Sequence, residues 1–193
     1  MTATARIVLV RHGPSAYVHH TRSVDLAGVY AWRDAYDRTG IQPDSQPPHA
    51  LIQLAEGAQH IIASDLPRAV ESAKRLAPER EVVISALLRE TMLDVPRWPT
   101  RMPAVAWEGL AHLVWGYRVL RGMDTTNEDR ARAIATSEWL AGLVVDGSTA
   151  VVVTHGVYRR QLSLQLLARG WISVGRTGGY DNWSTWSFTP AHR

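Results

Sequence analysis

Apolar residues gather in short runs along the chain, and these runs predict the strands of a sheet. Five segments show the pattern: Arg6–Val10, His60–Ala63, Glu81–Ser85, Thr149–Thr154 and Asn182–Thr189. The first four are rich in β-branched residues, which is typical of strands covered on both faces. The last alternates between aromatic and polar side chains, which predicts an edge or partly exposed strand.

Helical segments lie between these strands. The predicted helices are Leu66–Leu76, Glu108–Leu120, Asn127–Leu143 and Gly156–Ala168. In the first of them, Pro67 comes early, where a missing N–H costs little, and Ser64 or Asp65 is expected to cap the helix. Alternation of strands and helices at this spacing predicts an α/β fold, a three-layer α/β/α sandwich with a mostly parallel central sheet.

Two segments, Pro43–His49 and Asp94–Pro103, are rich in proline and predict loops rather than interdomain linkers. The whole chain, 1–193, is therefore expected to form a single domain. Residues of about 14–55 and 91–126 are expected to add a small cap of helices and loops to the sandwich.

Composition narrows the possible chemistry. The chain has 193 residues and no cysteine, which excludes disulfides, thiolate nucleophiles and cysteine metal sites. No secretory leader or membrane-length apolar run is evident, so we expect a cytoplasmic protein without a membrane partner. The formal charge of +3 suits anionic ligands, but the basic residues are scattered, so no nucleic-acid partner is expected.

Polar residues that carry chemistry follow the predicted strands. Ligands of open α/β sheets bind beyond the carboxyl ends of the strands, so these residues are expected to converge on one site. They are Arg11, His12, Gly13 and Ser15 after the first strand, Ser64, Asp65 and Arg68 after the second, Arg89 and Glu90 after the third, and His155 and Gly156 after the fourth.

This set of residues suits the binding and transfer of a phosphoryl group. Arg11 and Arg68 offer forked, permanently charged donors, and a protonated His155 would add a third charge. The helix that starts at Gly156 would direct free N–H groups to the same place. A neutral His12 could attack phosphorus from one ring nitrogen, while the other nitrogen donates its proton to a backbone carbonyl.

A leaving alkoxide needs a proton, and a carboxylic acid is the natural source. Glu90 is the candidate, provided that burial or nearby phosphate charge raises its pKa. Glu108 and Asp94 are the alternative acids.

Four motifs together resemble those of the histidine phosphatase superfamily, which includes the phosphoglycerate mutases. They are Arg11-His12-Gly13, Ser64-Asp65-Leu66-Pro67-Arg68-Ala69, Leu88-Arg89-Glu90 and Thr154-His155-Gly156. The resemblance implies that His12 becomes phosphohistidine and that Arg11, Arg68 and His155 hold the phosphoryl oxygens. It also implies that Glu90 acts as proton donor and then as base, with no metal and no organic cofactor.

The chain departs from the family pattern beside the first motif. Ser15 is retained as a candidate substrate contact, like Gly156, but Pro14 replaces an acid or amide and Val18 replaces an asparagine. Tyr17, His19 or His20 are candidates to compensate. His19 and His20 do not predict a metal site, because adjacent histidines rarely point at one ion.

An aromatic group, Trp107, Trp115 and Tyr117, lies on or near one predicted helix. These residues are expected in the core, on a homodimer surface or in the wall of the cap.

The function predicted from these features is a phosphatase that hydrolyses a small phosphorylated metabolite, a phosphomonoester, through phosphohistidine on His12. The short chain favours hydrolysis over mutase chemistry, since a mutase must also hold a second anionic group. A phosphoglycerate mutase-type phosphotransferase and a catalytically silent phospholigand-binding module are the alternatives.

Overall fold

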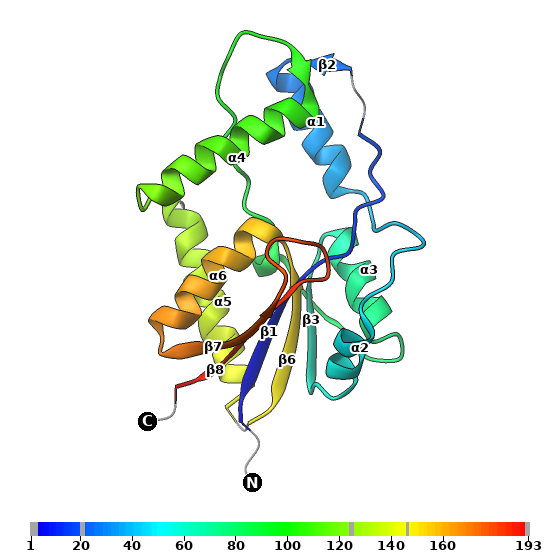
Figure 1. Cartoon of the computed structure of the whole chain (residues 1–193), viewed down its shortest axis with the longest axis vertical. Coiled ribbons are helices and arrows are strands. Elements are labelled where there is room, and N and C mark those ends of the chain that lie inside the picture. Colours follow the sequence, from blue (N-terminus) through cyan, green and yellow to red (C-terminus); the bar gives the residue numbers. More distant parts are fainter. Residues whose placement is uncertain (1–3, 20–21, 124–125, 146, 192–193) are drawn as a thin grey trace.

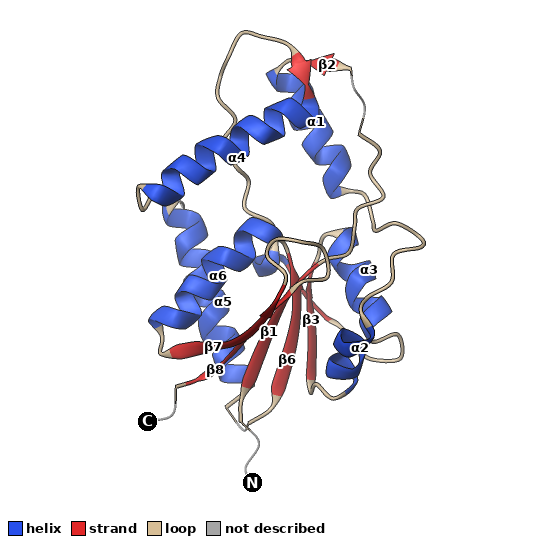
Figure 2. Cartoon of the chain, viewed as in Figure 1, coloured by secondary structure: helices blue, strands red, loops and turns tan. Residues whose placement is uncertain are grey.

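A central sheet lies between two layers of helices in the computed structural model, which describes residues 4–19, 22–123, 126–145 and 147–191 (Figure 1, Figure 2). The six strands run in the order β4-β3-β6-β1-β8-β7. Their bounds are Arg6–Arg11 (β1), His60–Ser64 (β3), Val83–Ser85 (β4), Thr149–Thr154 (β6), Trp171–Thr177 (β7) and Thr185–Pro190 (β8). The predicted mixed α/β sandwich is thus confirmed.

The four strands β4, β3, β6 and β1 are mutually parallel, and β8 runs antiparallel to both β1 and β7. A short 3₁₀ turn, Ala86–Leu88 (η1), follows β4. The carboxyl ends of the four parallel strands therefore meet at one edge of the sheet. This edge is where the predicted functional residues lie.

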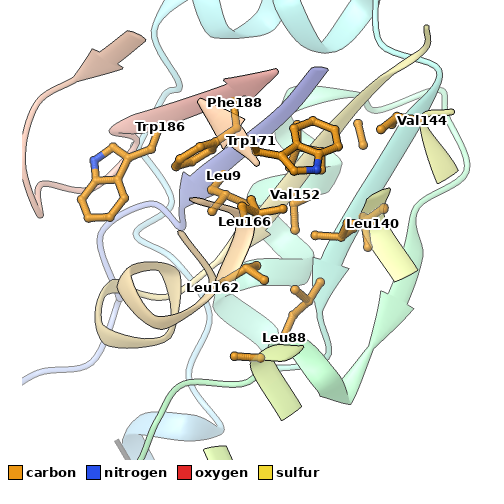
Figure 3. Packing of buried hydrophobic residues seen from close by; sticks show 14 of the residues in the cluster. Leu9, Leu88, Leu140, Val144, Val152, Leu162, Leu166, Trp171, Trp186 and Phe188 are labelled. Carbon is orange, nitrogen blue, oxygen red and sulfur yellow. The ribbon is translucent and has the colours of Figure 1, made fainter. Parts of the chain in front are cut away.

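Both faces of the sheet are apolar, because successive side chains of a strand point to opposite sides. In β1, Ile7 and Leu9 pack toward α5 (Asn127–Leu143) and α6 (Gly156–Ala168), in the core shown in Figure 3. Val8 and Val10 pack on the other face, toward α2 (His49–Glu56) and α3 (Pro67–Leu76). The buried strands therefore show continuous apolar runs rather than alternation.

The cap stands above the carboxyl edge of the sheet (Figure 1). It contains α1 (Leu26–Asp37), α4 (Ala104–Leu120) and a two-stranded ribbon of β2 (Ser23–Val24) and β5 (Met102–Pro103). A small core of its own holds the cap together, formed by Val29, Leu93, Val95, Trp107 and Ala111 with Val157 of α6. Trp107 is thus a core residue, whereas Tyr117 on the same helix is exposed.

The first predicted cap segment, 14–55, reaches too far along the chain. It takes in α2, whose Leu51 and Ala55 pack with α3 and the sheet instead of the cap. The helix was not predicted because it is short and follows a proline-rich segment.

The predicted position of the last strand is wrong. β8 lies inside the sheet, between β1 and β7, and Phe188 at its centre is fully buried. It also starts later than predicted, since Trp183 has a φ of 61° that no strand accommodates. The edge strand on this side of the sheet is β7, which the sequence did not reveal because six of its seven residues are not buried.

The predicted cap of α3 is also wrong. Leu66 is the N-cap residue and makes no side-chain cap hydrogen bond. Asp65 instead accepts two hydrogen bonds from Arg89, at 2.8 and 2.6 Å. Within the described residues, no helix is long and apolar enough to cross a membrane.

We expect Phe188→Ala to lower the free energy of unfolding by about 3–5 kcal/mol, because it opens a cavity in the core between the sheet and α6. Ile172→Ala on the exposed edge strand is the matched control and should cost less than about 1 kcal/mol. Urea titration of both variants measures the difference. Equal losses would show that β8 does not form part of the core.

Candidate active site

The pairing of β1 with β6 brings the two histidines together. Arg11 is paired with Thr154 in parallel register, so the residues that follow, His12 and His155, leave the sheet side by side. The backbone N–H of His12 donates to the carbonyl of Thr154 at 3.0 Å, and the two imidazole rings lie 5.1 Å apart. Two segments separated by most of the chain therefore form one site.

A hydrogen bond sets the tautomer of His12. Its Nδ1 lies 2.7 Å from the carbonyl oxygen of Gly13, which can only accept, so Nδ1 carries the proton. The lone pair of the neutral ring is then on Nε2, the nitrogen available for attack on phosphorus. The backbone around the ring is held as well, since Asn182 donates from Nδ2 to the His12 carbonyl at 2.7 Å.

Gly13 has no room for a side chain. A Cβ at this position would lie 2.5 Å from the indole of Trp183, and its N–H donates to Ser72 Oγ at 2.9 Å. Ser72 in turn donates to the carbonyl of Arg68 at 2.6 Å. The loop that carries the histidine is therefore tied directly to the helix that carries the arginine.

Arg68 is buried in the first turn of α3, and the cap helix α1 holds one edge of its guanidinium. Nη1 donates to Asp37 Oδ1 at 3.0 Å, and the guanidinium carbon lies 4.6 Å from the centre of the Tyr36 ring. Arg11 is anchored at the other side of the site, where Nη1 donates to the carbonyl of Tyr180. In each arginine, one guanidinium nitrogen is thus held by a hydrogen bond to the protein.

Four buried nitrogens of these residues have no hydrogen-bond partner within the part of the chain that the structure describes. They are Nε of Arg11, Nε of Arg68, and both ring nitrogens of His155. A buried polar group without a partner costs on the order of 1–3 kcal/mol, so native proteins keep few of them. Their accumulation around His12 indicates a place prepared for an oxygen-rich ligand.

Burial keeps both histidines neutral. Desolvation, with the charge of Arg68 next in importance, lowers the pKa of His12 from 6.5 to about 3. The pKa of His155 is also lowered well below 6.5, by desolvation first and then by His12 and the arginines. His155 therefore offers hydrogen bonds at neutral pH, rather than the positive charge that the sequence suggested.

Glu90 lies beside the first turn of α6, and its carboxylate accepts hydrogen bonds from backbone N–H groups. Oε1 accepts from Tyr158 at 2.8 Å and from Thr91 at 3.0 Å, and Oε2 accepts from Val157 at 3.3 Å. Two of the helix N–H groups that were predicted to face an anion are thus occupied by this side chain. The three donors stabilise the carboxylate, but burial outweighs them and raises the pKa of Glu90.

A pocket of about 260 Å³ opens in front of His12 and is bounded by the cap. Glu90 and Glu108 both line it, so the structure keeps both as candidate acids. Asp94 lies in a different pocket and forms an ion pair with Arg118, which removes it from this group. The lining residues are Arg11, His12, His19, Trp32, Arg33, Tyr36, Asp37, Arg68, Glu90, Thr91, Met92, Leu93, Glu108, His112 and Val157.

Three predicted substrate contacts, Ser15, His155 and Gly156, do not line this pocket. His155 is fully buried beside His12. Ser15 pairs with Ile41 in an isolated bridge, and its Oγ accepts the N–H of Tyr17 at 3.2 Å. Gly156 lies behind Arg11, where a Cβ would be 3.6 Å from the arginine Nε. This is an ordinary van der Waals distance, so the space at this position does not by itself require glycine.

His19 lines the pocket, whereas His20 lies outside the described residues. In the ranges that the structure covers, no group of three His, Asp or Glu side chains could hold a metal ion.

The sequence did not reveal Asp37, Tyr36 or Asn182 as parts of the site. Asp37 and Tyr36 belong to a helix that was not predicted, and Asn182 was assigned to the last strand. The Gly178-Gly179 pair shortly before Asn182 is a sequence signal that predicts a turn here.

The molecule is an α/β sandwich with buried, unpartnered donors at the carboxyl edge of its sheet, and its sequence identifies the family. The family model of the histidine phosphatase superfamily (branch 1) matches residues 7–192. The chain belongs to this superfamily. A search of curated proteins found no match to the chain.

The chain is similar to several solved structures at low sequence identity. A mutant phosphoserine phosphatase from Entamoeba histolytica, in complex with phosphoserine, is 18% identical with a TM-score of 0.52, over 84% of this chain and 80% of that chain. The phosphatase in complex with 3-phosphoglyceric acid is 19% identical, with the same coverage and TM-score. An ecdysone phosphate phosphatase from Bombix mori is 16% identical with a TM-score of 0.48, over 84% and 77% of the two chains.

We expect stability to fall as the pH drops below about 6.5 in phosphate-free buffer. His12 takes up a proton at pH 6.5 in the unfolded chain but only near pH 3 in the folded protein, so acid favours the unfolded state. Between pH 7 and pH 5 this residue alone should remove about 2 kcal/mol from the free energy of unfolding.

Urea titrations of the wild type and of His12→Asn at the two pH values measure this contribution. The comparison isolates the contribution of His12, because the contributions of His155, with the same sign, and of Glu90, with the opposite sign, are present in both proteins. An identical pH dependence in the variant would contradict the burial of a neutral His12.

Proposed function

We propose that this protein is a phosphatase that hydrolyses a small phosphomonoester through a phosphohistidine on His12. One observation carries the proposal: buried, unpartnered nitrogens of Arg11, Arg68 and His155 surround a neutral histidine whose Nδ1 proton is already committed to Gly13. An arrangement of fixed donors around a nucleophile stabilises charge that develops during transfer. Three peripheral phosphoryl oxygens would satisfy the donors.

In the first step, His12 Nε2 forms a bond to phosphorus as the bond between phosphorus and the ester oxygen breaks. The departing oxygen takes the proton of Glu90, whose raised pKa keeps it protonated to higher pH than a free glutamate. The products are phosphohistidine and an alcohol. The imidazole gains a positive charge that the phosphoryl oxygens balance.

In the second step, water attacks the phosphoryl group and the phosphorus–nitrogen bond breaks. Glu90, now a carboxylate, takes a proton from the water. This regenerates the neutral imidazole and the protonated acid, and it releases inorganic phosphate. The three backbone N–H groups that donate to Glu90 stabilise its ionised form in this step.

Hydrolysis is favoured over mutase chemistry by the charges of the pocket. Beyond the two arginines at His12, the lining carries one further arginine, Arg33, which is paired with Glu108 at 3.4 Å. A second anionic group on the substrate would thus meet a neutralised cation. The phosphoserine phosphatase that shares the fold offers a precedent for hydrolysis on this scaffold.

We expect His12→Ala to lower kcat for a generic aryl phosphate by on the order of a thousandfold or more, because the attacking nitrogen is lost. His49→Ala, at an exposed histidine on α2, is the matched control and should retain wild-type activity. Quenching the wild type with alkali after mixing it with labelled substrate should trap phosphate on the protein that is stable to base and released by acid. Unchanged turnover by His12→Ala would refute the nucleophile, and a lack of any trapped phosphate or turnover would favour a silent binding module.

Glu90→Gln should slow the hydrolysis of alkyl phosphates by on the order of a hundredfold and that of 4-nitrophenyl phosphate far less, because a nitrophenolate leaves without a proton. Glu108→Gln, the alternative acid in the same pocket, is expected to change both rates by the same factor. Steady-state kcat/KM for the two esters gives the comparison. If Glu108→Gln instead slows the alkyl phosphates more than 4-nitrophenyl phosphate, the proton donor is Glu108 of α4.

A further inference from the structure

One face of the cap helix α1 is directed at the pocket in front of His12. Trp32, Arg33, Tyr36 and Asp37 all line it, and their spacing of one, four and five residues places them on one side of a helix. The rings of Trp32 and Tyr36, four residues apart, are stacked with centres 5.9 Å apart and planes 28° apart. They form a continuous aromatic wall.

This wall begins where the phosphoryl group would be bound. Tyr36 lies against the guanidinium of Arg68, at 4.6 Å, and Trp32 continues the row to His19, whose ring centre is 5.8 Å further on. Tyr17 meets all three rings at steep angles, with centres 5.5–6.1 Å away, and supports the wall from one side. A substituent on the phosphoryl oxygen would therefore run along aromatic surface from its first atoms.

The stability of the cap does not explain this cluster. Trp107 fills the core of the cap, fully buried, with its Nε1 donating to the Val24 carbonyl at 3.1 Å. Trp32 is only partly buried, belongs to none of the three hydrophobic cores found in the described part of the chain, and borders hollows on two sides. A large aromatic side chain is thus kept at the pocket, outside the apolar cores that hold the cap and the sandwich together.

The facing wall comes from α4 and its preceding loop. Glu108 and His112 line it together with Leu93, and the ion pair of Arg33 with Glu108 joins the two walls across the pocket. One side therefore consists of aromatic side chains, and the other offers an apolar residue and hydrogen-bonding groups. A slot of this kind matches a flat ring better than a branched or fully hydrated chain.

We propose that the leaving group of the substrate is a planar aromatic or heteroaromatic ring, packed against Trp32 while the phosphoryl group is at His12. Trp32 is then a specificity-determining residue. The proposal rests on the proposed function for the position of the phosphoryl group. Stacking on an aromatic side chain favours a ring over a saturated group of the same size, because only the ring presents a π-face.

Benzyl phosphate and cyclohexylmethyl phosphate form the test pair, since both release a primary alcohol of the same carbon number. The wild type should show a kcat/KM about tenfold higher for the benzyl ester. Trp32→Leu should bring the ratio close to one, and Trp32→Phe should keep most of it. Tyr30→Leu, at an exposed aromatic residue of the same helix, should leave the ratio unchanged.

Calorimetric titration with benzylphosphonate and cyclohexylmethylphosphonate, which cannot be hydrolysed, separates ring recognition from chemistry. The benzyl compound should bind the wild type about tenfold more tightly, and Trp32→Leu should lose this preference. A ratio near one in the wild type, or an equal loss for both compounds in Trp32→Leu and Trp32→Phe, would overturn the ring site and leave the proposed function standing. Preferential binding of the benzyl compound without hydrolysis of any ester would support the ring site and overturn the phosphatase.

Discussion

The parallel pairing of β1 with β6 is the constraint on which the rest of the site depends. Their register aligns Arg11 with Thr154, so His12 and His155 emerge together although 143 positions separate them in the chain. Every other group is placed relative to this pair: Arg68 through the hydrogen bonds of Ser72, and Asn182 through the carbonyl of His12. A shift of one residue in the register of β1 would turn its side chains to the opposite face of the sheet and separate the residues of the site.

Burial gives this site its chemical character. Removing the two imidazoles from water holds them neutral, and the same burial raises the pKa of Glu90 although three N–H groups favour its ionised form. Unpartnered donors on Arg11 and Arg68 are costly in the folded protein, and the apolar cores on both faces of the sheet supply the stabilisation that offsets them. The burial that shifts these pKa values also leaves the arginine nitrogens without partners, so both effects have the same cause.

The sandwich and the cap contribute different residues to the site. The sandwich supplies the proposed nucleophile His12, the two arginines and the candidate acid Glu90, all from segments that follow its parallel strands (Figure 2). The cap supplies Asp37, which holds one edge of Arg68, and the aromatic side chains that border the pocket. Changes in the cap could therefore alter what is bound while the reacting groups stay in place.

The sequence by itself determined the parallel strands, the bounds of α5 and α6, and the residues at the strand ends, because apolar periodicity and short motifs are local properties. Tertiary structure alone decided that β7 forms the edge, that the N–H groups of α6 serve Glu90, that His155 is neutral and that Asp37 meets Arg68. These features depend on which segments become neighbours and how deeply they are buried. Strand register and desolvation are collective properties of the folded chain, and no local pattern of residues encodes them.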